Sequence, residues 1–237
     1  MGKIRAAQLV SVLGYDFLFQ DVDVVWFKSP LEYFRNHSDN TFDMYFQKDG
    51  VVSKYNTPFG VNTGFYFVRN SELTQYFFTS LLLNGDTMFR SHNDQEDIGV
   101  RLADFSSVYG LKVKVIPRTE ITAPGGYQFH DVSPFGKEHM RNILNKTHEP
   151  YVFHMSWTEG KAHKIQYFQQ MGQWHVHEEC VEKTFDEIVA GSSSANTTIP
   201  VHCCSLVPIV RCHYRDKPSI IPCTNYPPID NGAPSWW

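Results

Sequence analysis

The sequence predicts an α/β fold in which helices flank a β-sheet. Segments with apolar residues at helical spacing alternate along the chain with runs rich in β-branched and aromatic residues. The run at residues 15–26 is almost continuously apolar, which is typical of a strand buried on both faces. With 237 residues, 42% of them hydrophobic and 19% charged, the chain can also form a substantial core.

The N-terminal half is predicted to hold two helices and three strands. Apolar residues recur at helical spacing over residues 3–13, and Gly14 follows at a position where glycine commonly ends a helix. The strand at 15–26 comes next. Pro30 favours a short helix over residues 31–35, because proline fits the first turn of a helix. Two further strands are expected at residues 42–46 and 64–69.

The alternation continues in the C-terminal half. Helical periodicity marks residues 73–83 and 97–108, and Gly110 follows the second of these helices. Alternating apolar and lysine residues predict a strand at 111–116. The last core elements that we expect are a strand at residues 151–155 and a helix at residues 158–171.

The composition changes after residue 177. All five cysteines and seven of the 13 prolines lie in this last segment, together with a run of serines that follows Gly191. We therefore predict two regions: a folded domain at residues 1–177 and an irregular tail, rich in cysteine and proline, at residues 178–237.

The clustered cysteines have two interpretations. Disulfides are favoured, and they indicate an oxidising compartment. Zinc binding is the alternative, because histidines lie among the cysteines, but the spacing lacks the C-x-x-C pairs of structural zinc sites. Three N-glycosylation patterns, which begin at Asn36, Asn145 and Asn196, agree with a luminal location. The cysteines concerned are Cys180, Cys203, Cys204, Cys212 and Cys223.

Charge and hydropathy argue against two kinds of partner. The 21 basic and 25 acidic side chains give a formal net charge of -4, so no basic field is present to attract nucleic acid. No apolar run approaches the roughly 20 residues that a membrane-spanning helix needs. Residues 1–13 lack the pattern of a signal peptide. We expect no nucleic-acid partner and no membrane contact through the residues given.

Two carboxylates and an imidazole are predicted to meet at the edge of the sheet. Asp21 and Asp23 end an apolar strand and, because side chains alternate along a strand, point to the same side. Two such carboxylates repel each other unless a cation binds both, as a divalent metal does. His154 ends another apolar strand, and an imidazole ligand favours manganese over magnesium. The alternatives are solvated loop carboxylates and a hydrogen-bonded core histidine.

Three further polar segments are candidates for ligand binding. Residues 62–64, Asn-Thr-Gly, are predicted to form a turn before a strand, where glycine lets a ligand approach the backbone; a plain turn is the alternative. Residues 93–97 place polar side chains at a helix start, where they can equally serve as helix caps. Lys161, near the start of the last helix, can hold a diphosphate as a point charge or be a solvated surface lysine.

Four of these motifs occur in an order that resembles a known family. They are residues 14–30 with Asp-Val-Asp, residues 61–65 with Asn-Thr-Gly, residues 93–95, Asn-Asp-Gln, and residues 154–158, His-Met-Ser-Trp-Thr, followed by Lys161. Together they resemble the nucleotide-diphospho-sugar transferase family, which includes plant and algal arabinosyl- and xylosyltransferases. The resemblance covers roughly residues 3 to 175.

The resemblance implies a GT-A fold, which is Rossmann-like and has a mixed, mostly parallel sheet. It also implies a glycosyltransferase that depends on Mn²⁺ or Mg²⁺ and moves a sugar, with retention of configuration, from a nucleotide-diphosphate donor to a glycoprotein or polysaccharide acceptor. UDP is the expected nucleotide. The implied location is the Golgi lumen, as a type II membrane protein.

The same resemblance implies roles for residues of this chain. Asp21, Asp23 and His154 would bind the metal, and Asp94 and Gln95 would lie beside the reacting carbon. The residues that would bind the donor are Asp21, Asn62, Thr63, Gly64, Trp157 and Lys161, the last of them on the leaving diphosphate. The chain departs from the family at Glu96, where Asp or Val is common.

The Asp-Val-Asp motif begins at residue 21, whereas in the family it lies deep in the domain, behind a base-binding βαβ unit. We therefore expect this chain to be a fragment without that unit and without a membrane anchor, and to bind UDP weakly or not at all; the alternative is a divergent relative that has lost donor binding. Two other hypotheses remain open. One is a haloacid-dehalogenase-like phosphatase with Asp21 as nucleophile, and the other is a non-catalytic luminal protein that binds carbohydrate.

Overall fold

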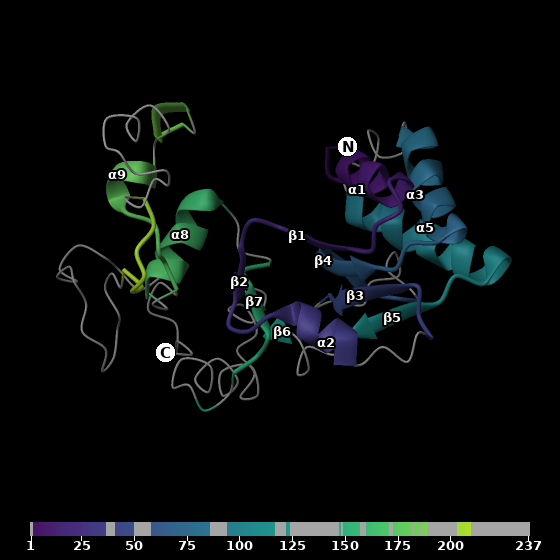
Figure 1. Cartoon of the computed structure of the whole chain (residues 1–237), viewed down its shortest axis with the longest axis horizontal. Helices are drawn as coiled ribbons and strands as arrows, with labels where there is room; N and C mark the ends of the chain where they lie inside the picture. Colours follow the sequence, from purple (N-terminus) through teal and green to yellow (C-terminus); the bar gives the residue numbers. More distant parts are fainter. Residues whose placement is uncertain are drawn as a thin grey trace. The chain divides into compact units, whose positions relative to one another are not determined.

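The chain divides into two compact units, each of which is described by itself (Figure 1). The first unit comprises Met1–Tyr127 with Lys146–Ser156, and the second comprises Gln128–Asn145 with Trp157–Trp237. The domain boundary that we predict after residue 177 stays a prediction. The computed structural model describes residues 2–36, 41–49, 58–85, 94–116, 122–123, 147, 149–156, 160–170, 173–181, 183–184, 186–188 and 203–209.

Helices and strands alternate in the first unit, and the predicted α/β fold with a mixed sheet is confirmed. Its helices are α1 (Gly2–Val12), α2 (Pro30–Asn36), α3 (Glu72–Leu83) and α5 (Asp94–Tyr109). Its strands are β1 (Phe17–Gln20), β2 (Val24–Trp26), β3 (Met44–Lys48), β4 (Val61–Val68), β5 (Val113–Ile116), β6 (Thr122–Ala123) and β7 (Val152–His154).

The strands form two sheets, and their directions correct one expectation. The first sheet has the order β1-β4-β3-β5, in which β4 is antiparallel to both β1 and β3, while β5 is parallel to β3. The second has the order β2-β7-β6, with an antiparallel and a parallel pair. The expectation of a mostly parallel sheet is therefore wrong for the described ladders. Consecutive strands β3 and β4 are neighbours in the sheet, so the chain reverses direction between them as in a hairpin.

The apolar run at residues 15–26 is two strands rather than one. β1 pairs with β4 in the first sheet, whereas β2 pairs with β7 in the second. The prediction that the run is buried on both faces is also wrong, because β1 lies at a sheet edge and both strands are partly exposed. The break between them falls at residues 21–23, so the Asp-Val-Asp motif lies where the chain passes from one sheet to the other.

The first sheet is covered on both faces. Helices α1, α3 and α5 pack on one face and α2 packs on the other (Figure 1). β4 is the centre of this core, since all eight of its residues are buried. Tyr66 and Val68 contribute to the cluster under the three helices, while Phe65 and Phe67 contribute to the cluster under α2. Because successive side chains of β4 point to opposite faces of the sheet, this one strand contributes to both clusters.

Two site segments begin earlier than we predict. β4 begins at Val61, so residues 62–64 lie inside the strand and do not form a turn before it. α5 begins at Asp94, so Asp94 belongs to the helix and is not its cap. Asn93 lies outside the described residues. Residues 62–64 lie next to the Asp-Val-Asp motif, because the Asp21 N–H donates to the Gly64 carbonyl, and the start of α5 contacts β4 through Gln95 and Thr63.

A substitution of the buried Leu102 tests how α5 packs against the core. Its side chain is 0% exposed, so Leu102→Ala should leave a cavity and lower the free energy of unfolding by about 2–5 kcal/mol. Val100 on the same helix is 54% exposed, and Val100→Ala should change the free energy of unfolding by less than about 1 kcal/mol. Urea unfolding followed by circular dichroism measures both. Equal losses for the two variants would contradict this packing.

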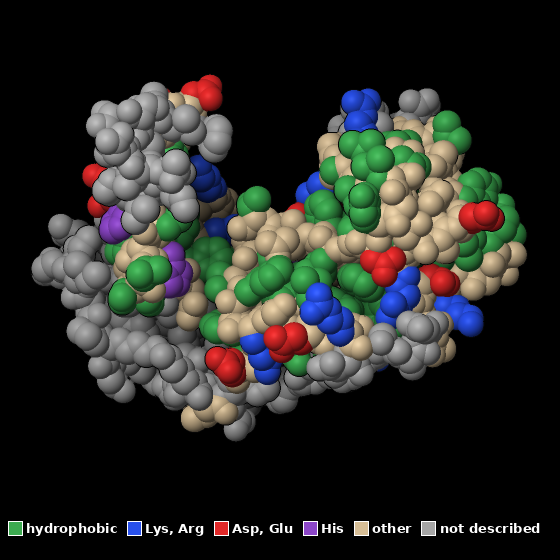
Figure 2. All heavy atoms as spheres, in the orientation of Figure 1, with side chains coloured by type: hydrophobic (Ala, Val, Ile, Leu, Met, Phe, Trp, Pro, Cys, Tyr) green, Lys and Arg blue, Asp and Glu red, His purple; other side chains and the backbone are tan. Residues whose placement is uncertain are grey.

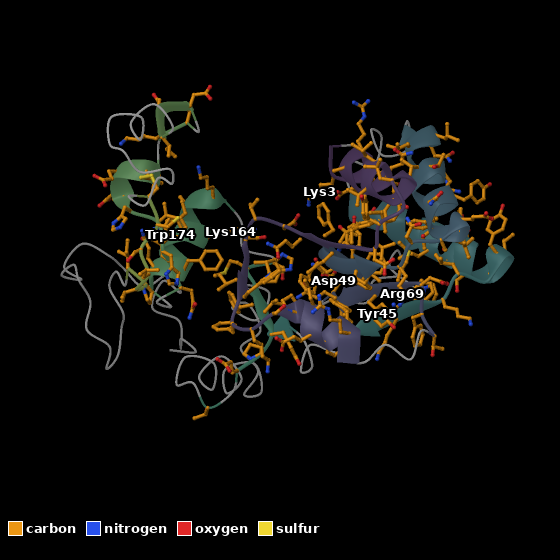
Figure 3. The ribbon with its side chains drawn as sticks, in the orientation of Figure 1. Lys3, Tyr45, Asp49, Arg69, Lys164 and Trp174 are labelled. Atoms are coloured by element: carbon orange, nitrogen blue, oxygen red, sulfur yellow. A yellow bond between two sulfur atoms is a disulfide. The ribbon has the colours of Figure 1, made fainter. Side chains whose placement is uncertain are left out.

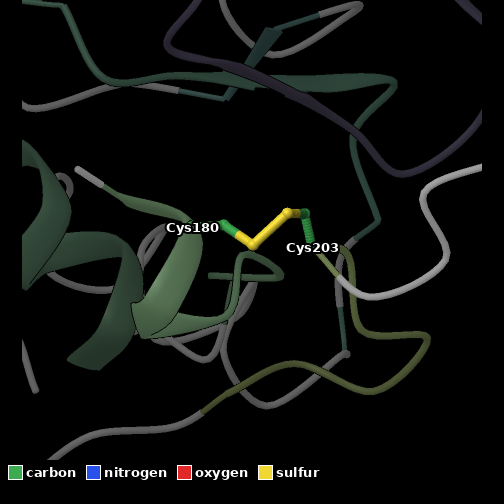
Figure 4. Close-up of a disulfide and its surroundings, with 2 residues drawn as sticks. All are labelled: Cys180 and Cys203. Atoms are coloured by element: carbon green, nitrogen blue, oxygen red, sulfur yellow. A yellow bond between two sulfur atoms is a disulfide. The ribbon is translucent and has the colours of Figure 1, made fainter. Parts of the chain in front are cut away.

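The second unit contains α8 (Lys161–Gln170), α9 (Glu178–Val181) and a disulfide between Cys180 and Cys203 (Figure 4). The prediction of a disulfide is thereby confirmed for one pair. Cys203 is then not available as a zinc thiolate, which counts against the zinc alternative. Cys204 is exposed and not disulfide-bonded. Cys212, Cys223 and the sequons at Asn145 and Asn196 lie outside the described residues, and the irregular tail stays a prediction.

The described surface carries charges of both signs. Acidic and basic side chains are interspersed on the face that Figure 2 shows. Large apolar side chains of the helices are also exposed, among them Leu9, Leu83 and Val108. Within the ranges that the structure covers, no helix combines the length and the apolar character needed to span a bilayer.

Candidate metal and donor site

Three predicted ligands, Asp21, Asp23 and His154, come together in the first unit. Each offers one ligand atom, and these atoms all lie within 4.8 Å of one another. His154 Nε2 is 3.3 Å from Asp23 Oδ1. The imidazole is buried, whereas both carboxylates are partly exposed. A group of two carboxylates and one imidazole, open on one side, can hold a divalent metal ion.

Backbone pairing positions the two carboxylates. The Asp21 N–H donates to the Gly64 carbonyl of β4 over 2.7 Å. The Met155 N–H donates to the Asp23 carbonyl over 3.0 Å, and Val24 pairs with His154 in the β2–β7 ladder. Asp21 is thus attached to the first sheet and Asp23 to the second, so the carboxylates meet because the two sheets meet.

Gln47 fixes the orientation of the His154 ring. Its Oε1 lies 2.7 Å from His154 Nδ1, and both side chains are buried. An amide oxygen only accepts hydrogen bonds, so in a neutral imidazole Nδ1 carries the proton and donates it to Gln47. The lone pair on Nε2 then faces Asp23. A metal-binding histidine is commonly held by such a contact to its second nitrogen.

Gly64 provides the space in which the three ligands meet. A Cβ atom at this position would overlap His154 Cε1 and would lie 2.8 Å from Asp21 Oδ2. It would also lie 3.0 Å from Asn62 Oδ1. The Asn-Thr-Gly motif therefore ends in glycine because any side chain at this position would collide with His154 and Asp21, and not because the backbone turns there.

A second polar cluster surrounds Asp49, whose position Figure 3 shows. Asn62 Nδ2 donates to Asp49 Oδ1 and Gln95 Nε2 donates to Asp49 Oδ2, each over 3.2 Å. The amide oxygens accept from β4: Gln95 Oε1 from the Thr63 N–H at 3.3 Å, and Asn62 Oδ1 from the Gly64 N–H at 2.8 Å. The structure thus brings together four predicted residues around a carboxylate that sequence reasoning missed.

Lys3 of α1 is, after Gln47 and Asp49, a third residue that the sequence analysis missed (Figure 3). Its Nζ lies 2.6 Å from Asp21 Oδ1, with side chains 44% and 27% exposed. A pair this exposed contributes little to stability. Its relevance is electrostatic, because an ammonium group partly neutralises the carboxylates at the place where the metal ligands meet. No local pattern in α1 distinguishes this lysine from an ordinary surface lysine.

Tyr66 lies close to the acidic groups. Burial raises the pKa of its hydroxyl well above the usual range, and the negative charges of Asp94 and Asp21 raise it further. Tyr66 therefore keeps its proton at any physiological pH. Its ring stacks on those of Phe46 and Phe19, so its main contribution is to the core beneath the site.

Two predicted donor residues lie outside the described part of the first unit. Lys161 is the first residue of α8, is exposed and belongs to the second unit. Trp157 lies outside the described residues. The roles of both stay predictions.

The family model of the nucleotide-diphospho-sugar transferases matches residues 1–168. The chain belongs to this family. The resemblance inferred from four motifs is thereby confirmed, and every residue of the two polar clusters lies within the matched region.

One curated relative is the beta-arabinofuranosyltransferase RAY1 of Arabidopsis thaliana. It is 27% identical to this nucleotide-diphospho-sugar transferase family member over 183 residues, which are 73% of this chain and 33% of the relative. The chain thus spans about a third of the length of that protein. No solved structure is significantly similar to the chain.

The residues present fit a divalent metal, as the family would lead one to expect. Two carboxylates and an imidazole supply suitable ligand atoms, Gln47 lies within hydrogen-bonding distance of the second ring nitrogen of His154, and Gly64 leaves the space next to His154 and Asp21 clear.

Proposed function

We propose that this chain carries the donor site of a glycosyltransferase. In this proposal a sugar moves from a nucleotide diphosphate, with UDP as the favoured nucleotide, to a glycan or glycoprotein acceptor. The observation that carries the proposal is the meeting of Asp21, Asp23 and His154 beside Gly64 in a member of the nucleotide-diphospho-sugar transferase family. Because the relative RAY1 is named as an arabinofuranosyltransferase, arabinofuranose is the first donor sugar to test.

The proposed metal is Mn²⁺, with Mg²⁺ as the alternative. An imidazole among the ligands favours the softer ion. Asp21, Asp23 and His154 would hold it. When bound, such an ion neutralises charge that develops on the leaving diphosphate. Lys161 is proposed to hold the leaving diphosphate as a positive charge.

The remaining residues have proposed tasks at the reacting carbon. Asp94 and Gln95 are the first two residues of α5, and Gln95 contacts β4. We propose that both lie beside the reacting carbon of the donor sugar. Tyr66 keeps its proton and so cannot act as a base. In retaining transfer the leaving phosphate itself can accept the proton of the acceptor hydroxyl, so the proposal includes no separate base.

We propose that the site works in the lumen of the Golgi. The disulfide between Cys180 and Cys203 supports an oxidising compartment. The phosphatase hypothesis, in which Asp21 is a nucleophile, is not supported by the family to which the chain belongs.

A donor-consumption assay tests the proposal. The chain is incubated with millimolar UDP-arabinofuranose, UDP-xylose or UDP-glucose and a mixed polysaccharide acceptor, because we expect UDP to bind weakly. UDP release, measured by chromatography, should require Mn²⁺ and should stop when EDTA is added. One donor should be consumed faster than the others.

The opposite result is equally informative. If circular dichroism shows a folded chain that neither binds Mn²⁺ nor consumes any donor above the EDTA control, the glycosyltransferase proposal fails. The non-catalytic carbohydrate-binding hypothesis would then account for the fold.

A further inference from the structure

Asp49 is a buried carboxylate that no motif explains. It follows β3 directly and is 1% exposed. Its N–H donates to the Gly60 carbonyl over 2.8 Å, which joins the two ends of the connection between β3 and β4. A carboxylate is costly to bury unless hydrogen bonds compensate for lost water. At Asp49 this compensation includes two side-chain amides, which come from β4 and from α5.

The chemistry of a carboxylate dictates how these amides lie. An ionised carboxylate only accepts hydrogen bonds, so Asn62 and Gln95 must both turn their NH₂ groups toward Asp49. Their oxygens then point away from it. Asn62 Oδ1 meets the Gly64 N–H at 2.8 Å and Gln95 Oε1 meets the Thr63 N–H at 3.3 Å. The buried carboxylate thus selects one of two orientations for each amide.

We propose that Asp49 is a positioning residue of the donor site. By fixing both amides it holds the first turn of α5, with Asp94 and Gln95, against the segment of β4 that contains Thr63 and Gly64. The catalytic consequence rests on the proposed function, whereas the positioning does not.

The hydrogen bonds continue from Asp49 to the metal ligands. Asn62 contacts both Asp49 and the N–H of Gly64, and the carbonyl of Gly64 accepts from the Asp21 N–H at 2.7 Å. Gly64 in turn leaves space for His154. Asp49 therefore connects the start of α5 with the Asp-Val-Asp segment through four consecutive hydrogen bonds, from Gln95 through Asp49 to the segment of β4 at Gly64. A change at Asp49 should displace groups on both sides of the bound donor.

Asp49→Asn is the sharpest variant. It keeps the size of the side chain but replaces one acceptor oxygen with an NH₂ group, which repels the NH₂ group of Asn62 or Gln95. Asp43→Asn is the matched control. Asp43 immediately precedes β3, and its Oδ2 accepts from the Lys112 N–H at 2.8 Å, in contacts that do not involve the site.

Two measurements separate positioning from a merely structural role. The first follows the side-chain amide protons of Asn62 and Gln95 by NMR. In the unaltered chain they should exchange slowly with water, and Asp49→Asn, unlike Asp43→Asn, should shift them and speed their exchange. The second is transfer kinetics. Asp49→Asn should lower kcat by about 10- to 100-fold with little change in the donor KM, as expected when reacting groups are misplaced.

Each outcome is decisive. Fast exchange of both amides in the unaltered chain, a result that needs no variant, would overturn the positioning. So would unchanged amide signals or unchanged kcat in Asp49→Asn. If the unaltered chain transfers no sugar, the proposed function fails, and the amide signals still decide whether Asp49 orients the two side chains.

Discussion

Replacing Gly64 with alanine is expected to destroy the metal site and reduce transfer by more than about 10²-fold. The added methyl group would overlap His154 Cε1 and lie within 2.8 Å of Asp21 Oδ2 and 3.0 Å of Asn62 Oδ1. The backbone cannot retreat. The N–H of Gly64 bonds to Asn62 and its carbonyl to the Asp21 N–H, while β4 is paired on both sides. The imidazole and the carboxylate must therefore move apart.

The effect of Gly64→Ala on folding should be smaller than its effect on the site. Overpacking costs about 1–3 kcal/mol in the free energy of unfolding. Gly99 of α5 is the matched control, since a Cβ there would meet nothing within 4 Å. Gly99→Ala should leave Mn²⁺ binding unchanged and stabilise the helix by up to about 1 kcal/mol. Titration of Mn²⁺ by electron paramagnetic resonance distinguishes the two, and wild-type affinity in Gly64→Ala would show that the methyl group can be accommodated.

The helices and the three candidate metal ligands could be picked out because each leaves a local signal. The helices have apolar residues at regular spacing, and Asp21, Asp23 and His154 each end an apolar run. The three side chains converge where the chain passes from the first sheet to the second, next to the end of β7. The structure places α3 and α5 within a few residues of the predicted ranges.

The pairing of strands could not be predicted, because it depends on partners far along the chain. The apolar run at 15–26 is continuous in sequence, but its first half pairs with β4 and its second half with β7. A hydrophobic run indicates that a strand is buried, but it does not indicate which strand or sheet it pairs with. The direction of β4 was missed for the same reason.

The residues that support the site also leave no local signal. Gln47 contacts a ring 107 positions further along the chain, and Asp49 contacts Gln95 at a separation of 46. Lys3 resembles any lysine on an exposed helix face. Such residues become functional candidates only when the fold brings them to the metal ligands or to the residues beside them.

Replacing Asp23 with asparagine is expected to remove most Mn²⁺ binding and to lower transfer by about 10²- to 10³-fold. The substitution keeps the size of the side chain but removes the negative charge that faces His154 Nε2 at 3.3 Å. The fold should tolerate it, because the Asp23 carbonyl still accepts from the Met155 N–H. Removing one of two neighbouring carboxylates also relieves repulsion in the metal-free chain.

Asp16→Asn is the matched control for Asp23→Asn, since Asp16 accepts a hydrogen bond from the Asn70 N–H at 2.7 Å in an exposed position away from the ligands. It should transfer sugar as the unaltered chain does. Transfer rates across a series of Mn²⁺ concentrations then separate two explanations. If Asp23 acts by holding the ion, higher Mn²⁺ should restore part of the activity of Asp23→Asn. If the loss came from a disturbed fold, added metal would restore nothing, and unchanged turnover at low Mn²⁺ would refute the role of Asp23 as a ligand.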